Sequence, residues 1–312
     1  MLADNPALVL TFVFVALFVA TDLINRAQTG DAFLTPKQVS TTFLYAAILG
    51  LIAAGQTLVM LTGGIDLSVA TTATAGAFMV ARVGTQGPLA GILLALGIGL
   101  AIGLVNGIGV ALFRVNPLIM TLGISTITVG GLTILSQKSY VAEVPGFVQT
   151  LGTDRFLTYI PYDLFIWAPI AALIILGLRY SGIGRMIYAV GDNPVACRLA
   201  GVRVWQVQLV VYVLCGALSA AAGVLIVGFN AAADLEIAKS FLLPSVAAVV
   251  IGGTSIFGGV GGYAGTILGA LILTVLGSLL TILDASEALK QITYGLIILA
   301  LAAVYARAAA SD

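Results

Sequence analysis

Histidine is absent from the 312 residues, and Cys197 and Cys215 are the only cysteines. The missing histidine removes the commonest general base and the commonest metal ligand, which argues against a hydrolase and against a metal site. Two cysteines are too few for a disulfide framework. Charged residues make up only 8% of the chain, with 13 basic and 13 acidic side chains, so no basic field favours nucleic acid as a partner.

Apolar residues are abundant, at 60% of the chain, and the mean hydropathy is +1.15. Repeated apolar runs approach the roughly 20 residues that a helix needs to cross a bilayer. A β-barrel would show short segments of alternating character in their place. The sequence therefore predicts an all-α, polytopic helical membrane protein, with a single transmembrane domain over residues 1–312.

About ten transmembrane helices are expected, and the eighth is interrupted. Charged residues occupy its first half, and Pro244 lies near its middle, so only residues 243–251 are cleanly apolar. At ~1.5 Å per residue this piece is a half-helix, too short to cross alone. The ten expected segments are residues 7–25, 41–62, 67–83, 89–113, 117–136, 163–180, 204–229, 231–252, 262–282 and 288–307.

Two long polar connections, residues 137–162 and residues 181–203, are separated by a single expected helix and should lie on opposite sides of the membrane. The remaining lysines and arginines are divided almost evenly between the two sides, so only the density of arginine around residues 181–203 marks that connection as cytoplasmic. Residues 137–162 are then periplasmic, and both termini are cytoplasmic. The four arginines concerned are Arg179, Arg185, Arg198 and Arg203.

A short helix is predicted inside the 181–203 connection. Asn193 is a good N-cap, Pro194 suits the first helical position, and Gly201 fits the residue just past the end. Val195 and Leu199 are four residues apart and share one face. Because so short a helix is unstable alone, its apolar face needs a partner. The residues alone favour lipid headgroups and a protein partner equally.

Two glycine pairs interrupt apolar runs in similar ways: Gly63-Gly64 precedes Asp66, and Gly252-Gly253 precedes Thr254. Interrupted helices in corresponding places of two halves point to a transporter's solute route. The similarity is slight, interhelical hydrogen bonding is an equal alternative for the polar residues, and the depth of the glycines in the membrane stays open. The candidate pathway residues are Gln56, Thr62, Gly63, Gly64, Asp66, Ser68, Asn106, Gly252, Gly253, Thr254 and Ser255.

Asp66 is the only acid between Asp31 and Glu143. A carboxylate at the start of the third expected helix can accept backbone N–H groups as a cap, and we favour this role over contact with a solute. Glycines also recur at every fourth position, a spacing that lets helix backbones approach closely. We interpret them as packing positions: Gly99, Gly103 and Gly107, and Gly261, Gly265 and Gly269.

Three stretches together resemble one known family: LVMLTGGIDLSVA (residues 58–70), SGIGRMIYAVGDNPVACRLAGVRV (residues 181–204) and VAAVVIGGTSIFGGVGG (residues 246–262). Over nearly its whole length the chain is similar to the ribose-type permeases of bacterial ATP-binding cassette (ABC) importers. The resemblance implies that residues 181–203 form a cytoplasmic coupling loop that contacts an ATPase. The coupling residues would be Arg185, Asp192, Asn193, Pro194, Arg198, Leu199 and Gly201.

The same resemblance implies the partners: two cytoplasmic ATPase subunits or one tandem ATPase, a second permease copy in a homodimer or heterodimer, a periplasmic solute-binding protein, and the bilayer of the bacterial inner (plasma) membrane. The chain itself carries no G-x-x-x-x-G-K-[ST] phosphate-binding loop. We therefore expect it to be no enzyme and to hold no cofactor, because ATP would bind to the partner.

The resemblance fails in one place, since ribose-type members commonly carry an acidic pair where this chain has Phe241-Leu242-Leu243-Pro244. Asp234 and Glu236 upstream could replace these acids, or the solute contacts could differ. A monosaccharide or polyol is the expected solute, and nucleosides stay open. The alternatives are an ion-coupled secondary transporter, which would need more buried charge than a solitary Asp66, and a channel.

Overall fold

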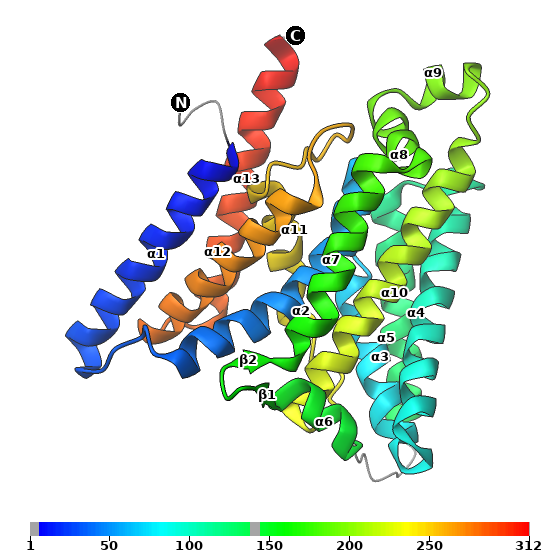
Figure 1. Ribbon diagram of the computed structural model, residues 1–312. Helices are drawn as coiled ribbons and strands as arrows, with labels where there is room; N and C mark the ends of the chain where they lie inside the picture. Colours follow the sequence, from blue (N-terminus) through cyan, green and yellow to red (C-terminus); the bar gives the residue numbers. More distant parts are fainter. Residues whose placement is uncertain (1–5, 138–143, 312) are drawn as a thin grey trace.

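The computed structural model describes residues 6–137 and 144–311, and these ranges are almost entirely helical. The helices form one bundle of roughly parallel and antiparallel rods (Figure 1). Within the described residues, seven helices are long and apolar enough to cross a membrane, which confirms the all-α polytopic membrane fold. They are α1 (Pro6–Thr29), α2 (Pro36–Leu61), α4 (Pro88–Ala111), α5 (Pro117–Ser136), α7 (Tyr162–Tyr180), α10 (Val204–Asn230) and α12 (Tyr263–Ile282).

Prolines at the first helical position define several helix starts. The Thr35 hydroxyl accepts the backbone N–H of Gln38 (3.2 Å) just before Pro36 opens α2. The side chain of Asn116 does the same for Leu118 (2.9 Å) at the start of α5. Proline has no N–H to lose there and its φ is already helical. The expected start of α2 at residue 41 was wrong, because this capping signal precedes the apolar run.

Helix α2 is the centre of the bundle, and residues 46–61 are all buried. The Trp167 indole of α7 donates to the Tyr263 hydroxyl of α12 (2.6 Å), and that hydroxyl donates to the carbonyl of Gly50 in α2 (2.8 Å). These two bonds join three helices inside the bundle and satisfy groups that lipid could not.

The predicted glycine packing positions on α4 and α12 are confirmed, whereas Gly261 lies in the loop before α12 with φ +124°. A Cβ at Gly99 or at Gly103 would overlap the α10 backbone at Gly216 and at Tyr212. On α12, Gly269 makes an equally close approach to the backbone of α11 (Leu242–Ile251) at Ala248, and Gly265 does so at Gly252 just past the end of α11. Such close backbone contact is how helices associate without a hydrophobic driving force between them.

The predicted half-helix is also confirmed. Helix α10 ends at Asn230, and only a short 3₁₀ turn, η2 (Lys239–Phe241), precedes the ten-residue α11. The charged residues before it do not continue a helix, and Lys239 pairs with Glu236 in an exposed contact (2.6 Å). Two further helices complete the bundle, α3 (Val69–Val83) and α13 (Glu287–Ser311).

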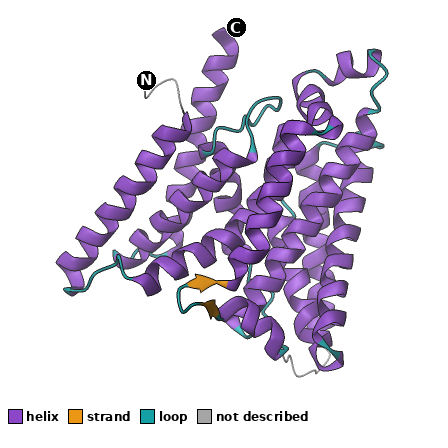
Figure 2. Cartoon of the chain, in the orientation of Figure 1, coloured by secondary structure: helices purple, strands orange, loops and turns teal. Residues whose placement is uncertain are grey.

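The bundle has two distinct ends (Figures 1 and 2). One end, the α9 end, carries α8 (Gly182–Asp192) and α9 (Pro194–Leu199), together with the start of α1 and the last turns of α13. The other, the hairpin end, carries η1 (Gly84–Gln86), α6 (Gly146–Thr153) and the antiparallel strands β1 (Arg155–Phe156) and β2 (Ile160–Pro161), drawn in orange in Figure 2. The two polar connections thus lie at opposite ends, as predicted; residues 138–143 of the first lie outside the described residues.

Candidate functional sites at the two ends of the bundle

Only the helix after Asn193 was predicted in the 181–203 connection, and the structure adds a second helix before it, α8. Its N-cap Ser181 accepts the backbone N–H of Gly184 (3.0 Å). Ile187 and Val190 are buried, whereas Arg185 faces outward. The three-residue spacing of Ile187 and Val190 is the sequence signal for this amphipathic helix.

The predicted capping of α9 is confirmed at each position. The Asn193 carboxamide oxygen accepts the N–H groups of Val195 (3.0 Å) and Ala196 (2.9 Å), and Pro194 takes the first helical position. Gly201 follows the helix with φ +82°, in the left-handed region that favours glycine. The short helix is therefore locally determined.

The apolar face of α9 points away from the bundle. Leu199 is 86% exposed and Val195 is 56% exposed, whereas Cys197 on the opposite side is buried. Arg198 and Asp192 are exposed beside them. An exposed aliphatic face flanked by charges is typical of a surface that binds a partner.

The first glycine pair lies at the α9 end, where Gly63 meets Phe257 and Gly258 of the loop that follows the second pair, beneath α8. The N–H of Gly259 donates to the carbonyl of Leu61 (3.0 Å), and the Tyr188 hydroxyl of α8 donates to the carbonyl of Gly261 (2.9 Å). Burial raises the pKa of Tyr188, so this hydroxyl keeps its proton and acts as a donor. Gly191 is so close to Leu61 and Gly259 that a Cβ would overlap both backbones. We call this contact the glycine junction: Leu61, Gly63, Gly191, Gly258 and Gly259.

The two helices end in the same local geometry, although the left-handed residue is the first glycine of one pair and the second glycine of the other. Gly63 (φ +77°) follows α2, and Gly253 (φ +87°) follows α11, each as a left-handed residue just past a helix end. Gly252 packs against the backbone of α12. The hydroxyls of Thr254 and Ser255 accept N–H groups of their own loop, from Gly262 (3.2 Å) and Phe257 (3.1 Å), so they are used locally.

Three other candidate residues form one buried network. The Asp66 carboxylate accepts both the backbone N–H (2.7 Å) and the hydroxyl (2.6 Å) of Ser68, and the Asn106 amide donates to that hydroxyl (2.8 Å). All three residues are at most 1% exposed. Asp66 therefore closes the turn before α3, and Ser68 occupies the N-cap position. Gln56 of α2 is also fully buried, and its amide has no hydrogen-bond partner within the described residues.

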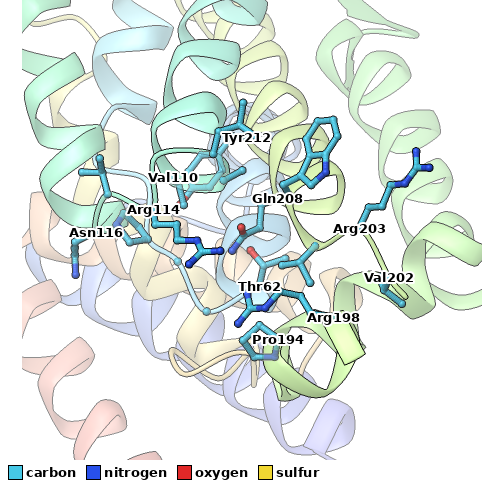
Figure 3. Close-up of a pocket in the computed structure, with 18 residues that line it drawn as sticks. Thr62, Val110, Arg114, Asn116, Pro194, Arg198, Val202, Arg203, Gln208 and Tyr212 are labelled. Carbon is cyan, nitrogen blue, oxygen red and sulfur yellow. The ribbon is translucent and has the colours of Figure 1, made fainter. Parts of the chain in front are cut away.

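A cavity of ≈ 500 Å³ opens at the α9 end (Figure 3). It lies between the α2–α3 loop, the α4–α5 connection, α9 and the first turns of α10. Thr62, Gly63 and Gly64, among the predicted pathway residues, line it. We call it the arginine cavity because of Arg114, Arg198 and Arg203 in its lining. No local pattern in the sequence indicates that Arg114 and Arg198 converge on one cavity, 84 positions apart in the chain.

A second cavity, of ≈ 560 Å³, lies at the hairpin end between α1, α2, α11, α12 and α13. Its charged residues are Glu287 and Lys290, which approach each other to 3.9 Å. We call it the hydroxyl cavity. Its other polar and aromatic lining residues are Asn25, Phe33, Thr35, Gln38, Tyr45, Ser240, Phe241, Thr274, Ser278, Thr281 and Tyr294.

The segment that departs from the resembled family contributes to this hydroxyl cavity. Phe241 and Pro244 belong to the lining, at the point where α11 begins. Asp234 and Glu236 are exposed and do not belong to it; the Asp234 carboxylate accepts the backbone N–H of Glu236 (2.6 Å). An aromatic ring and a proline thus stand where acids were expected.

A multi-pass helical bundle with a capped, outward-facing helix at one end and solute-sized cavities at both defines a membrane component of a transport system. The family model described as "Branched-chain amino acid transport system / permease component" matches residues 38–302. The chain belongs to this family of permeases, which are transporter subunits and not enzymes.

Curated relatives are similar over most of the chain. The ribose import permease of Escherichia coli K12 is 34% identical over 276 residues, which is 86% of this chain and 85% of the relative. The fructose import permease of Rhizobium meliloti is 30% identical over 319 residues, 97% of this chain and 86% of the relative. The L-arabinose ABC transporter permease of Azospirillum brasilense is 30% identical over 294 residues, 93% and 84%. No solved structure matches the chain.

Proposed function

We propose that this chain is the permease subunit of an ATP-driven ABC importer for a monosaccharide or polyol in a bacterial inner membrane. The relatives named for ribose, fructose and L-arabinose support a sugar. The hydroxyl cavity supports it too, because hydroxyls, amides and aromatic rings around one compensated charge pair fit a neutral polyhydroxylated solute.

In this proposal the chain is one transmembrane domain over residues 1–312 with ten membrane segments: α1–α5, α7, α10, η2 with α11, α12 and α13. The α9 end and both termini face the cytoplasm, and the hairpin end faces the periplasm. A second permease copy, two ATPase subunits or one tandem ATPase, and a periplasmic binding protein complete the importer.

The exposed face of α9 carries the proposal. Burying an aliphatic side chain such as Leu199 or Val195 gains about 1.5–3 kcal/mol, and the bundle leaves both in solvent. A groove on the ATPase would bury this face, with Arg185, Asp192 and Arg198 at its edge. Asn193, Pro194 and Gly201 would preserve the helix that presents it.

The glycine junction offers a route for the motion. Helix α2 ends there at Leu61, and α11, which ends at Ile251, reaches it through the loop that carries Gly258 and Gly259; both helices line the hydroxyl cavity with residues nearer their other ends. Because α8 contacts the junction without intervening side chains, a pull on α9 would shift both helices as rigid bodies. Movement of the ATPase would then reach the cavity at the far end.

We assign the solute route to the hydroxyl cavity followed by the polar residues deeper along α2 and α3. Gln56 supports this extension, because an unpaired buried amide costs about 1–3 kcal/mol that a passing solute hydroxyl would offset. Asp66, Ser68 and Asn106 would hold the start of α3 next to that route. The residues of the glycine pairs, Thr62 to Gly64 and Gly252 to Ser255, would act as its hinges at the cytoplasmic end.

Co-purification tests the proposal. The tagged permease, expressed with the ATPase encoded beside it, should retain that ATPase, and Leu199→Glu should lose it because a carboxylate cannot be buried in an apolar groove. Leu157→Glu is the matched control: Leu157 is 72% exposed in the turn between β1 and β2 at the hairpin end. If Leu199→Glu keeps both the ATPase and solute uptake, the importer proposal fails.

The solute is tested with the binding protein, since it would deliver the solute to the hydroxyl cavity. A thermal-shift screen should show stabilisation by pentoses, hexoses or polyols and none by leucine, isoleucine or valine. Stabilisation by the branched-chain amino acids of the family description, or by nucleosides alone, would overturn the sugar assignment and leave the docking of α9 untouched.

A further inference from the structure

We infer that the arginine cavity is a binding site for a phosphate group, at the surface where the α9 end leaves the membrane. Figure 3 shows the side chains of Arg114 and Arg198 extending toward the middle of the cavity, near Thr62 and Gln208, whereas Arg203 extends away toward the rim. Arg114 comes from the α4–α5 connection and Arg198 from α9, so a ligand held by both would join two separate segments.

The cavity has positive charge without compensation. Its lining contains three arginines and no aspartate or glutamate, and none of the three forms an ion pair within the described part of the chain. Two guanidinium groups at one cavity repel each other unless an anion lies between them. The buried Asp66 does not supply it, because Asp66 is 1% exposed and its carboxylate is held by Ser68.

A neutral donor completes the site. Tyr212 of α10 lines the cavity, is 1% exposed, and its hydroxyl has no hydrogen-bond partner within the described residues. This hydroxyl lies against Gly64, 2.6 Å from the point where a Cβ would stand. Buried hydroxyls are nearly always paired in native proteins, so the unpaired hydroxyl of a residue that lines the same cavity as the arginines points to a ligand that accepts hydrogen bonds.

The backbone fixes the position of Arg114. Its φ is +56°, which is uncommon for a residue other than glycine, and the next N–H, that of Val115, is bonded to the carbonyl of Gly109 (3.0 Å). Such strained positions persist where the surrounding structure determines them and cluster at binding sites. The backbone from which the Arg114 side chain extends is therefore fixed before any ligand arrives.

The chemistry favours phosphate. Arginine binds phosphate through paired N–H groups, and two arginines with a tyrosine hydroxyl match an anion with several acceptor oxygens. A lipid headgroup and a soluble phosphate share this chemistry. Exposed Phe113 (74%) and Trp205 (41%) flank Arg114 and Arg203, as expected at a membrane surface. A zwitterionic headgroup fits less well, because its ammonium would find no acid in the lining.

Native mass spectrometry of the purified full-length chain tests the site, with phosphatidylglycerol, phosphatidylcholine or sodium phosphate added in separate arms. We expect Arg114→Gln to weaken binding of the phosphate-bearing ligand by at least about tenfold, since hydrogen bonds to charged groups contribute about 1.5–3 kcal/mol. Tyr212→Phe should weaken it by up to about tenfold and Arg114→Lys by less than Arg114→Gln. Arg179→Gln is the control, because Arg179 is a basic residue of the same end outside the cavity lining.

The three added compounds distinguish a lipid headgroup from a soluble phosphate as the ligand. Retention of phosphatidylglycerol over phosphatidylcholine, lost in Arg114→Gln, assigns the site to an anionic lipid; a thermal shift with sodium phosphate alone, lost in the same variant, assigns it to a soluble phosphate. Equal binding by wild type, Arg114→Gln and Arg179→Gln in all arms would overturn the site. Arg114 could also be tested by chemical modification of arginine. If it becomes protected from modification only after an ATPase is added, the site is overturned in favour of an acidic protein partner. None of these readouts requires ATP-driven transport.

Discussion

The two cavities differ in charge, although they have nearly equal volumes. The arginine cavity collects three cationic side chains from three segments and no acid, whereas the hydroxyl cavity contains one acid and one base that pair with each other. The first therefore fits an anion, and the second fits a neutral polar solute. Helix α2, and α11 together with the loop that follows it, connect them, since each passes from the lining of the hydroxyl cavity to the glycine junction beside the arginine cavity.

The largest effect on solute uptake is expected from a substitution that disturbs the glycine junction, through which the two ends of the bundle would be linked. Gly191→Val would push a branched side chain into the backbone of Leu61 and Gly259. Overpacking costs about 1–3 kcal/mol, so coupled uptake should fall about ten- to hundredfold. Uptake and ATP hydrolysis by the reconstituted complex measure it.

Gly177→Val in α7 is the matched control, because a Cβ at Gly177 meets no atom within 4 Å. The idea that the junction links the ends is wrong if both variants transport equally well.

A smaller effect is expected from the hydroxyl cavity. Phe241→Ala removes the ring at the start of α11, and aromatic contacts contribute about 0.5–1.5 kcal/mol beyond burial, so the KM for uptake should rise about three- to tenfold. ATPase co-purification should not change, because Phe241 lies far from α9 along the bundle. Phe147→Ala on α6, an exposed ring outside the lining, should leave the KM unaltered. An unchanged KM for Phe241→Ala would remove the cavity from the solute route.

Tyr188→Phe tests a single contact at the junction. It removes the hydrogen bond to the Gly261 carbonyl, which contributes about 0.5–1.5 kcal/mol. We expect uptake to fall by about two- to tenfold with the ATPase still bound. Tyr180→Phe, at an exposed tyrosine of the same end, is the control and should match wild type.

The smallest effect is expected from Glu287→Gln. The pair with Lys290 is partly exposed and contributes roughly 0–1 kcal/mol to stability. For a neutral solute the uncovered lysine should change uptake by less than about twofold. A large change in uptake would show that the solute carries charge and would erase the contrast between the two cavities.

Several elements could be predicted because their determinants are local. The cap, first proline and terminal glycine of α9 lie within nine residues, and charges followed by Pro244 were enough to reduce the eighth expected helix to α11. The start of α2 was placed late, since a threonine cap outside the apolar run decided it. Helix α8 was missed because its buried face is only a few residues wide.

The sequence by itself determined the membrane-spanning helices, the half-helix and the outward helix α9, because periodicity, capping and backbone hydrogen bonds act over a few residues. Only the tertiary structure decided that Gly63 after α2 meets Gly258 of the loop after α11, under α8, and that Arg114 and Arg198 share a cavity. These contacts join positions dozens to hundreds of residues apart, and their geometry follows from how whole helices pack, which no local pattern encodes.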